Sequence, residues 1–227
     1  MYKLISIIML MLMTSLSYAN DIYVTQSGAS LDLDITQDGQ NNTVGNSSTA
    51  SSSTGATTIL DIDQVGNSNV IKYQINGATY TGTINLTGNS NDVDLNCDSA
   101  GNNSSCGTVT ASITMVGNSN DIDLDIGETS DSAGTTATIT SAASDDSNVI
   151  AATIDGTSAI LTITVDGDTN NWLVDIDGNG DVNGHTLIHT HTGGIADVDI
   201  VQSGLYDNMI TLTTSGDNHD IDISQTD

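Results

Sequence analysis

Carboxylate and amide side chains alternate through residues 175–183 at a spacing that suits a cation. The alternating residues are Asp175, Asp177, Asn179, Asp181 and Asn183. Gly180 stands at the sixth place, where a calcium loop turns sharply, but the twelfth place holds Thr186 instead of a bidentate Glu. The segment predicts a Ca²⁺ site that lacks its strongest ligand. The alternative is that a repeat in the chain produces the alternation without any metal.

Three histidines follow in the order His-x-x-x-His-x-His. They are His185, His189 and His191. Imidazoles at this spacing could hold Zn²⁺ or Cu²⁺. The alternative is that they are loop histidines without a metal, because the sequence offers no evident fourth ligand.

The first nineteen residues have the pattern of a secretory signal peptide. Lys3 precedes an apolar run, and Ser17 and Ala19 are the small residues of a cleavage site. We expect cleavage before Asn20, and the run is too short to span a bilayer. No other stretch is apolar enough to cross a membrane. The sequence thus predicts an exported protein, secreted or at the cell surface, with a single domain from residue 20 to residue 227.

Export decides how the two cysteines are interpreted. Cys97 and Cys106 bracket a short polar segment, and in an oxidising compartment such a pair forms a disulfide. The alternative is two free thiols. Neither cysteine has a nearby His or basic residue to stabilise a thiolate, so we expect no catalytic role for them.

Charge limits the partners that the chain can have. It holds 29 Asp and Glu against 2 Lys and Arg, a formal net charge of −27. This disfavours nucleic acid and anionic membranes and favours divalent cations. No Ser/His/Asp order, phosphate loop or isolated acid pair stands out among so many aspartates. We therefore predict a protein that is not an enzyme and needs no cofactor, apart from the Ca²⁺ considered above.

Glycine recurs every eleven residues within blocks of the chain, for example at Gly55, Gly66, Gly77 and Gly88. The fifth, seventh and ninth residues after each such glycine are mostly apolar or Gln, and those between are mostly polar. This alternation, bounded by Gly and Asn, predicts a strand with one buried face in each eleven-residue unit. We count fifteen strands. The eleventh, for example, has the inward row Leu161, Ile163 and Val165, and the fourteenth the weak row Met209, Thr211 and Thr213.

Four insertions interrupt the repeat, near residues 44–57, 98–108, 127–136 and 179–195. All of them follow even-numbered strands, so a two-strand coil would send every insertion out from one corner. The pattern predicts an all-β fold, a β-solenoid of about 7–8 stacked two-strand coils. A meander of hairpins could share the alternation but would not confine the insertions to one corner.

The turns carry a motif, Gln-x-Gly-x-x-Asn, that resembles the curlin repeat. The matching residues are Gln26, Gly28, Gln37, Gly39, Asn42, Gln64, Gly66, Asn69, Gly88, Asn91, Gly117, Asn120, Gly167, Asn170, Gln202 and Gly204, with Gln225 in the last strand. Stacked amides can form hydrogen-bonded ladders, and Gly permits the positive φ of a tight turn. The chain departs from the family in the middle, where the Gln column turns apolar from Ile75 to Ile176.

Curlins are subunits of curli, the extracellular amyloid fibres of bacterial biofilms. The resemblance implies a structural component or nucleator of such a fibre, which assembles with itself or with other curlin-like subunits. A second hypothesis is a monomeric solenoid that adheres to a partner in a cation-dependent way. A third is ice binding through Thr-x-Thr ladders. It ranks last, because the segments TIT, TAT and THT do not share a constant phase in the repeat.

Overall fold

The computed structural model describes residues 20–45, 48–66, 68–88, 90–97, 106–127, 134–142, 147–177, 184–204 and 208–226. The predicted signal peptide, residues 1–19, lies outside this range. Strands make up 84% of the structure, and the described residues contain no helix, which confirms the all-β prediction. Accordingly, the described chain has no helix of the length and apolarity that a membrane crossing requires.

The described residues form 17 strands. They are β1 (Asn20–Ile22), β2 (Thr25–Ser27), β3 (Ser30–Asp38), β4 (Asn41–Val44), β5 (Ser51–Val65), β6 (Ser68–Thr87), β7 (Ser90–Cys97), β8 (Thr108–Val116), β9 (Ser119–Ile126), β10 (Gly134–Ala142), β11 (Ser147–Asp155), β12 (Ala159–Asp166), β13 (Thr169–Asp177), β14 (Thr186–Thr192), β15 (Ile195–Ser203), β16 (Met209–Ser215) and β17 (His219–Thr226).

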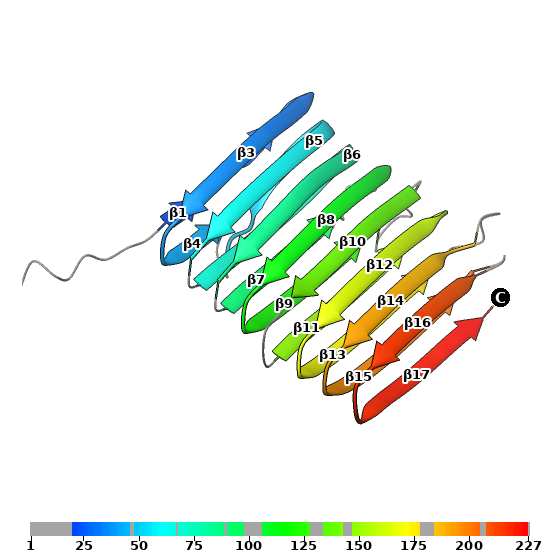
Figure 1. The fold of residues 1–227 in the computed structure, drawn as a ribbon. Helices are drawn as coiled ribbons and strands as arrows, with labels where there is room; N and C mark the ends of the chain where they lie inside the picture. Colours follow the sequence, from blue (N-terminus) through cyan, green and yellow to red (C-terminus); the bar gives the residue numbers. More distant parts are fainter. Residues whose placement is uncertain are drawn as a thin grey trace, which may run out of the picture.

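The strands stack in two parallel rows that face each other (Figure 1). The first sheet consists of β3, the second halves of β5 and β6, and β8, β10, β12, β14 and β16. The second sheet consists of β1, β2, β4, the first halves of β5 and β6, and β7, β9, β11, β13, β15 and β17. The chain alternates between the sheets, so β7 pairs with β9 and β8 with β10, all in parallel. The structure confirms the predicted β-solenoid, with about seven turns.

Alternate side chains of each strand fill the space between the sheets. One inward column of the first sheet consists of Ile35, Ile62, Ile84, Ile113, Ile139 and Ile163. One column of the second consists of Ile71, Val93, Ile122, Ile150, Trp172 and Val198. Every one of these side chains is buried. Because successive residues of a strand point to opposite faces, the intervening aspartates and threonines face solvent.

The corner from the first sheet to the second is tight, and glycine is needed there for close packing. A Cβ added to Gly66 would overlap the carbonyl oxygen of Gly39, and one added to Gly117 would overlap that of Gly88. The expected positive φ occurs farther along this corner, at Gly193, where φ is 150°. The expectation was wrong at Gly66 and Gly117, where the close approach of successive coils excludes a side chain.

The prediction of a first insertion at residues 44–57 was wrong about both its position and its length. Val44 pairs with Ile71 and Ser51 pairs with Tyr73, so the extra residues fall within a row of the second sheet, where only Lys72 separates their two pairing partners. From Ser51 onward the chain is β5, which crosses into the first sheet. This insertion therefore does not leave from a corner.

The other three insertions leave from one corner, as predicted. They connect β7 to β8, β9 to β10 and β13 to β14, each time from the second sheet to the first. The last of them is shorter than the predicted 179–195, because β14 is a strand of the first sheet. The count of fifteen strands was thus too low by two rows, β14 and the row formed by β4 with the first half of β5.

The inward row of β16 differs from the one predicted, whereas β10 has the predicted inward face in a register shifted by two residues. In β16 the residues that continue the inward columns are Ile210, Leu212 and Thr214, not Met209, Thr211 and Thr213. The connection from β15 does not preserve the eleven-residue count, which shifts the phase by one residue. In β10, Ser141 stacks on Met115 of β8. The residue predicted to do so, Ala143, lies outside the described residues.

Candidate functional site

A column of buried asparagines follows the tight corner along the second sheet. The pairing register stacks Asn42, Asn69, Asn91, Asn120, Asn148 and Asn170. Each of the six is at most 2% exposed, which is unusual for this polar residue. The repeat motif includes all of them except Asn148, because the sequence has Asp145 at the place where the motif has Gly.

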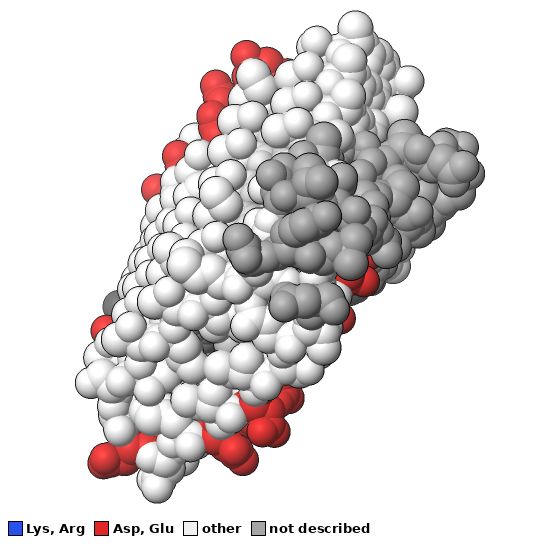
Figure 2. Space-filling model, turned by 90° about the vertical axis from the view of Figure 1, so that its right-hand side faces the viewer, with Lys and Arg blue, Asp and Glu red and all other residues white. Residues whose placement is uncertain are grey.

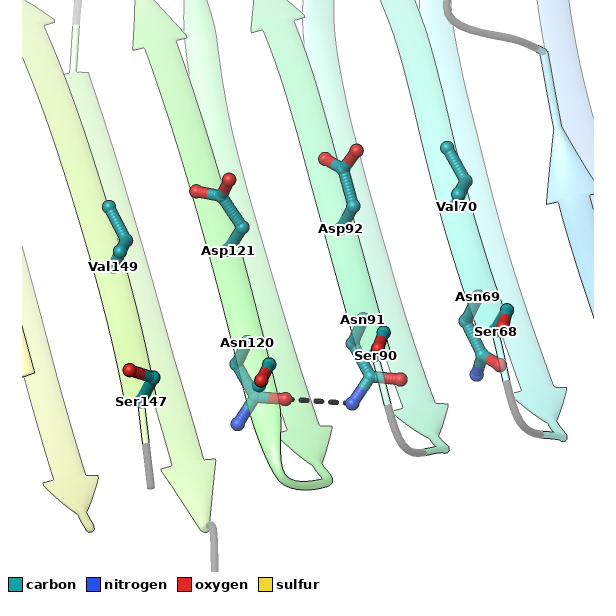
Figure 3. A pocket seen from close by; sticks show the side chains of 11 residues that line it. Ser68, Asn69, Val70, Ser90, Asn91, Asp92, Asn120, Asp121, Ser147 and Val149 are labelled. Carbon is teal, nitrogen blue, oxygen red and sulfur yellow. Dashed lines mark hydrogen bonds between the residues drawn. The ribbon is translucent and has the colours of Figure 1, made fainter. Parts of the chain in front are cut away.

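The amides in the middle of the column bond to one another. Nδ2 of Asn91 donates to Oδ1 of Asn120 at 2.7 Å, as Figure 3 shows. Nδ2 of Asn120 donates in turn to Oδ1 of Asn148 at 2.8 Å. Nδ2 of Asn148 donates to Oδ1 of Asn170 at 2.6 Å. This ladder gives buried polar groups partners in the coil above and below, so it specifies the register of the coils.

The asparagines nearer the N-terminus bond to the main chain instead. Nδ2 of Asn42 donates to the carbonyl oxygen of Gln37 at 3.0 Å, and Nδ2 of Asn69 donates to that of Gln64 at 3.1 Å. Each bond closes the turn between a strand of the first sheet and the next strand of the second. These asparagines therefore fasten the tight corner.

Glutamines pair near both ends of the solenoid. Nε2 of Gln64 donates to Oε1 of Gln37 at 2.5 Å in the first sheet. Nε2 of Gln225 donates to Oε1 of Gln202 at 3.2 Å in the second sheet. The structure thus brings together two of the predicted amide pairs, whereas Gln26 stacks on Ser53.

The predicted glycines divide between the two corners. Gly39, Gly66, Gly88, Gly117 and Gly167 lie at the tight corner, beside the asparagine column. Gly28 and Gly204 lie at the opposite corner, in the connections from β2 to β3 and from β15 to β16. The single sequence motif therefore covers two different structural positions.

Within the described residues, the core is open at both ends of the stack. The core side chains that are only partly buried are Ile22, Val24, Leu31 and Leu33 in the first coil and Ile210 and Ile221 in the last. Ile223, in the last row of the second sheet, is 48% exposed although its column is apolar. Among the described strands, β16 pairs only with β14 and β17 only with β15, so their outer edges have no strand partner.

Carboxylates cover much of the outer surface of the second sheet. Asp92, Asp121 and Asp123 lie there in adjacent rows, and burial followed by carboxylate neighbours raises the pKa of Asp123. Nζ of Lys72 forms an ion pair with Asp94 at 3.0 Å. Figure 2 shows acidic atoms along the edges of the molecule in that view, and no basic atom. This surface attracts cations and repels copies of itself.

The predicted Ca²⁺ ligands lie only in part among the described residues. Asp175 and Asp177 belong to β13, while Asn179 and Asp181 lie outside the described range. Asp177 accepts a hydrogen bond from Ser203 Oγ at 2.6 Å. In the described part of the chain, no three His, Cys, Asp or Glu residues are grouped to hold a metal. The Ca²⁺ site stays a prediction.

The histidines expected in a loop lie in the core. His189 and His191 belong to β14 and are fully buried. Their rings pack edge-on against Trp172, with centroid distances of 4.5 Å and 4.9 Å. Burial, and next the neighbouring His191, lower the pKa of His189 to about 4. These side chains are neutral core groups at neutral pH, which the polar appearance of the segment concealed.

Cys97 and Cys106 are joined in a disulfide, with their Cα atoms 5.7 Å apart. Cys97 ends β7, and both side chains are buried. The bond therefore closes the connection between β7 and β8 onto the core, at the corner where the long connections leave.

No family model, curated protein or solved structure matches this chain. The likeness to curlin repeats therefore rests on the residues of the sequence alone.

Proposed function

We propose that this chain is an exported structural protein whose solenoids stack end to end, as a component or nucleator of a curli-like surface or biofilm fibre. The supporting observation is the open core at both ends. Among the described residues, the core side chains that remain partly exposed lie in the first and last coils, where a further coil could cover them. An end of this kind either stays exposed at a cost or recruits another chain.

The last coil of one copy presents side chains of the same kind as the first coil of the next, if the strands of the two copies pair in the register that the coils have within one copy. In the second sheet, Ile221, Ile223 and Gln225 stand in the same columns as Ile22, Val24 and Gln26 of the first coil. In the first sheet, Ile210 and Leu212 stand in the columns of Leu33 and Ile35. A second copy therefore meets apolar residues with apolar residues and an amide with an amide.

Charge opposes this assembly and makes it conditional. The aspartate rows of two stacked copies would continue across the junction about 4.8 Å apart, where like charges repel. Divalent cations, added salt or mild acid reduce that repulsion. The partners proposed for the chain are accordingly a second copy or another curlin-like subunit, with divalent cations promoting the contact.

Blocking one end tests the proposal. Ile223→Lys places a charge at the open end, while Leu173→Lys places one on the outer side of the second sheet, at similar exposure (48% and 54%). We expect the wild type and Leu173→Lys to sediment as assemblies with Ca²⁺ present, and Ile223→Lys to remain monomeric with an unchanged circular dichroism spectrum. Equal sedimentation of the two variants would show that the ends are not the contact.

The alternative function, a cation-dependent adhesive monomer, predicts a different result. All three proteins would then stay monomeric at every protein concentration and would bind bacterial or host surfaces only when Ca²⁺ is present. That outcome would replace the fibre proposal.

A further inference from the structure

The outer surface of the first sheet differs in chemistry from the rest of the molecule. Six successive rows, from the second half of β6 to β16, share three adjacent outward columns at the middle of this surface. Threonine occupies most of the positions: Thr81, Thr83, Thr110, Thr114, Thr136, Thr138, Thr140, Thr162, Thr164, Thr186, Thr190, Thr211 and Thr213. The remaining positions hold Asn85, Ser112, Ile160, Ile188 and Met209. We call these eighteen positions the threonine face.

The threonines form a two-dimensional lattice. In one column, Thr114, Thr140, Thr164, Thr190 and Thr213 stand in direct register in five consecutive rows. Rows of a sheet lie about 4.8 Å apart, and alternate residues of a strand lie about 6.6 Å apart. The face therefore repeats hydroxyl and methyl groups with two fixed periods.

The threonine segments share one register in the structure, whereas the sequence alone shows no constant phase for them. The segments Ser112–Thr114, Thr138–Thr140 and Thr162–Thr164 stack one upon another, although the connections between them differ in length. Insertions at the corner from the second sheet to the first conceal the constant phase in the sequence, because they change the number of residues per coil and leave the register of the strands unchanged.

The threonine face carries no charged residue, in a chain with a net charge of −27. In the outward column next to it, which runs along the tight corner, Asp166 is the one charged residue in these six rows, between Ala142 and Thr192. The outer surface of the second sheet, by contrast, has Asp92, Asp121 and Asp123 in adjacent rows, and on the first sheet aspartates occur at the columns of the threonine face only in earlier rows, as at Asp61 and Asp63. A charged ligand is therefore not what this face fits. Its complement is an uncharged, flat surface with a matching lattice of hydrogen-bonding groups.

We propose that the threonine face binds ice. Ice presents a neutral lattice of donors and acceptors whose oxygen spacings are close to the two periods of this face. A threonine hydroxyl both donates and accepts a hydrogen bond, and its methyl group limits competing hydration. The backbone is fixed by ladders on both sides of each inner row, and β-branched side chains have few rotamers. Little conformational entropy is therefore lost on binding.

A crystalline polysaccharide is the nearest competing lattice. Aromatic side chains supply large, rigid contact area at binding surfaces, and they are enriched in protein interfaces. None of the eighteen positions holds one. The observations therefore favour ice, and binding to cellulose or chitin becomes an outcome that the test must separate.

The test compares two threonines that face opposite sides of the molecule. Thr138 lies at the centre of the threonine face, and Thr153 lies outward on β11 of the second sheet, between Asp125 and Asp175. Thr138→Tyr and Thr153→Tyr introduce the same bulk, and Tyr is favoured in strands, so both variants should fold. Thermal hysteresis and partition into a growing ice front are measured for the wild type and both variants.

We expect the wild type and Thr153→Tyr to show hysteresis and to be enriched in the ice fraction. Thr138→Tyr should lose most of both effects while keeping the melting temperature of the wild type. The proposal fails if the wild type shows neither effect, if the two variants behave alike, or if the protein pellets with crystalline cellulose or chitin and is excluded from ice. Because ice binding does not need assembled ends, Ile223→Lys should retain it, which separates this inference from the fibre proposal.

Discussion

Leu124 and Asp123 are neighbours in β9 that face opposite environments. Leu124 is fully buried between Ile122 and Ile126, whereas Asp123 is exposed on the outer surface. Leu124→Asp would bury a charge with no partner, so we expect a loss of more than about 4 kcal/mol in the free energy of unfolding.

Asp123→Asn is the matched control for that change. Burial and the carboxylates of Asp94 and Asp121 raise the pKa of Asp123, so its charged form is disfavoured in the folded chain. The neutral amide should leave the melting temperature unchanged or slightly raised. Similar losses in both variants would refute the assignment of faces in this strand.

His189 makes stability depend on pH. Its pKa falls from 6.5 to about 4 on folding, chiefly through burial, so the unfolded chain binds a proton more readily than the folded chain between these values. The stability is fully present above pH 6.5 and is lost as pH falls towards 4. The loss is on the order of 3 kcal/mol, at about 1.4 kcal/mol per pKa unit.

His189→Ile tests this dependence, because the column of His189 holds Ile163 in the row before it. Chemical denaturation between pH 7 and pH 4 should show a smaller decline in stability for the variant than for the wild type. His191, which stacks on Val165 and contacts Trp172 and His219, stays in place and contributes in the same direction. Parallel pH curves for the two proteins would contradict the assignment.

At the scale of the strand, the asparagine ladder links the coils through side chains. Asn120 accepts from Asn91 and donates to Asn148 and to Ser141 Oγ. Asn120→Ala removes these bonds from buried partners, so we expect a loss of about 1–3 kcal/mol in unfolding free energy. Asn171→Ala, on the exposed face of β13, should cost under about 0.5 kcal/mol. Equal small effects in urea denaturation would show that the ladder contributes little.

The corner glycines give a second prediction at this scale. A Cβ at Gly66 would overlap backbone atoms of Gly39, which cannot move aside as a side chain could, while a Cβ at Gly134 would meet only Ser158 O at 3.9 Å. Gly66→Ala should therefore lower the melting temperature strongly, and Gly134→Ala should leave it unchanged or raise it, since alanine restricts the unfolded chain. Thermal melts of the two variants decide the point, and a tolerated Gly66→Ala would contradict the close packing of this corner.

Strands that keep the eleven-residue count and an apolar inward row could be predicted from the sequence, and those that break either rule could not. Leu161, Ile163 and Val165 alternate after Gly156, and they are inward in β12 as expected. β14 was missed because its inward residues include His189 and His191, which have the composition of a loop. Histidine is tolerated there because the large ring of Trp172 packs against it. Such a pairing depends on stacking between distant segments, which no local pattern shows.

At the scale of the whole molecule, two opposing titrations act on the solenoid. Burial, followed by carboxylate neighbours, raises the pKa of Asp123 and of Asp175. Their stabilising effect is fully present below the ordinary value of 3.8 and is lost as pH rises through the folded pKa. Mild acid therefore reduces the repulsion between carboxylates on the outer surface of the second sheet. It also favours protonation of the buried His189, which destabilises the core.

The central claim is that open, matching ends make this solenoid stack. The most direct measurement is electron microscopy with X-ray fibre diffraction of the concentrated protein, with Ca²⁺ and at mildly acid pH. The account predicts unbranched fibres with a reflection near 4.8 Å along the fibre axis, because strands of successive copies continue one ladder. Particles that remain single solenoids under all of these conditions would contradict it.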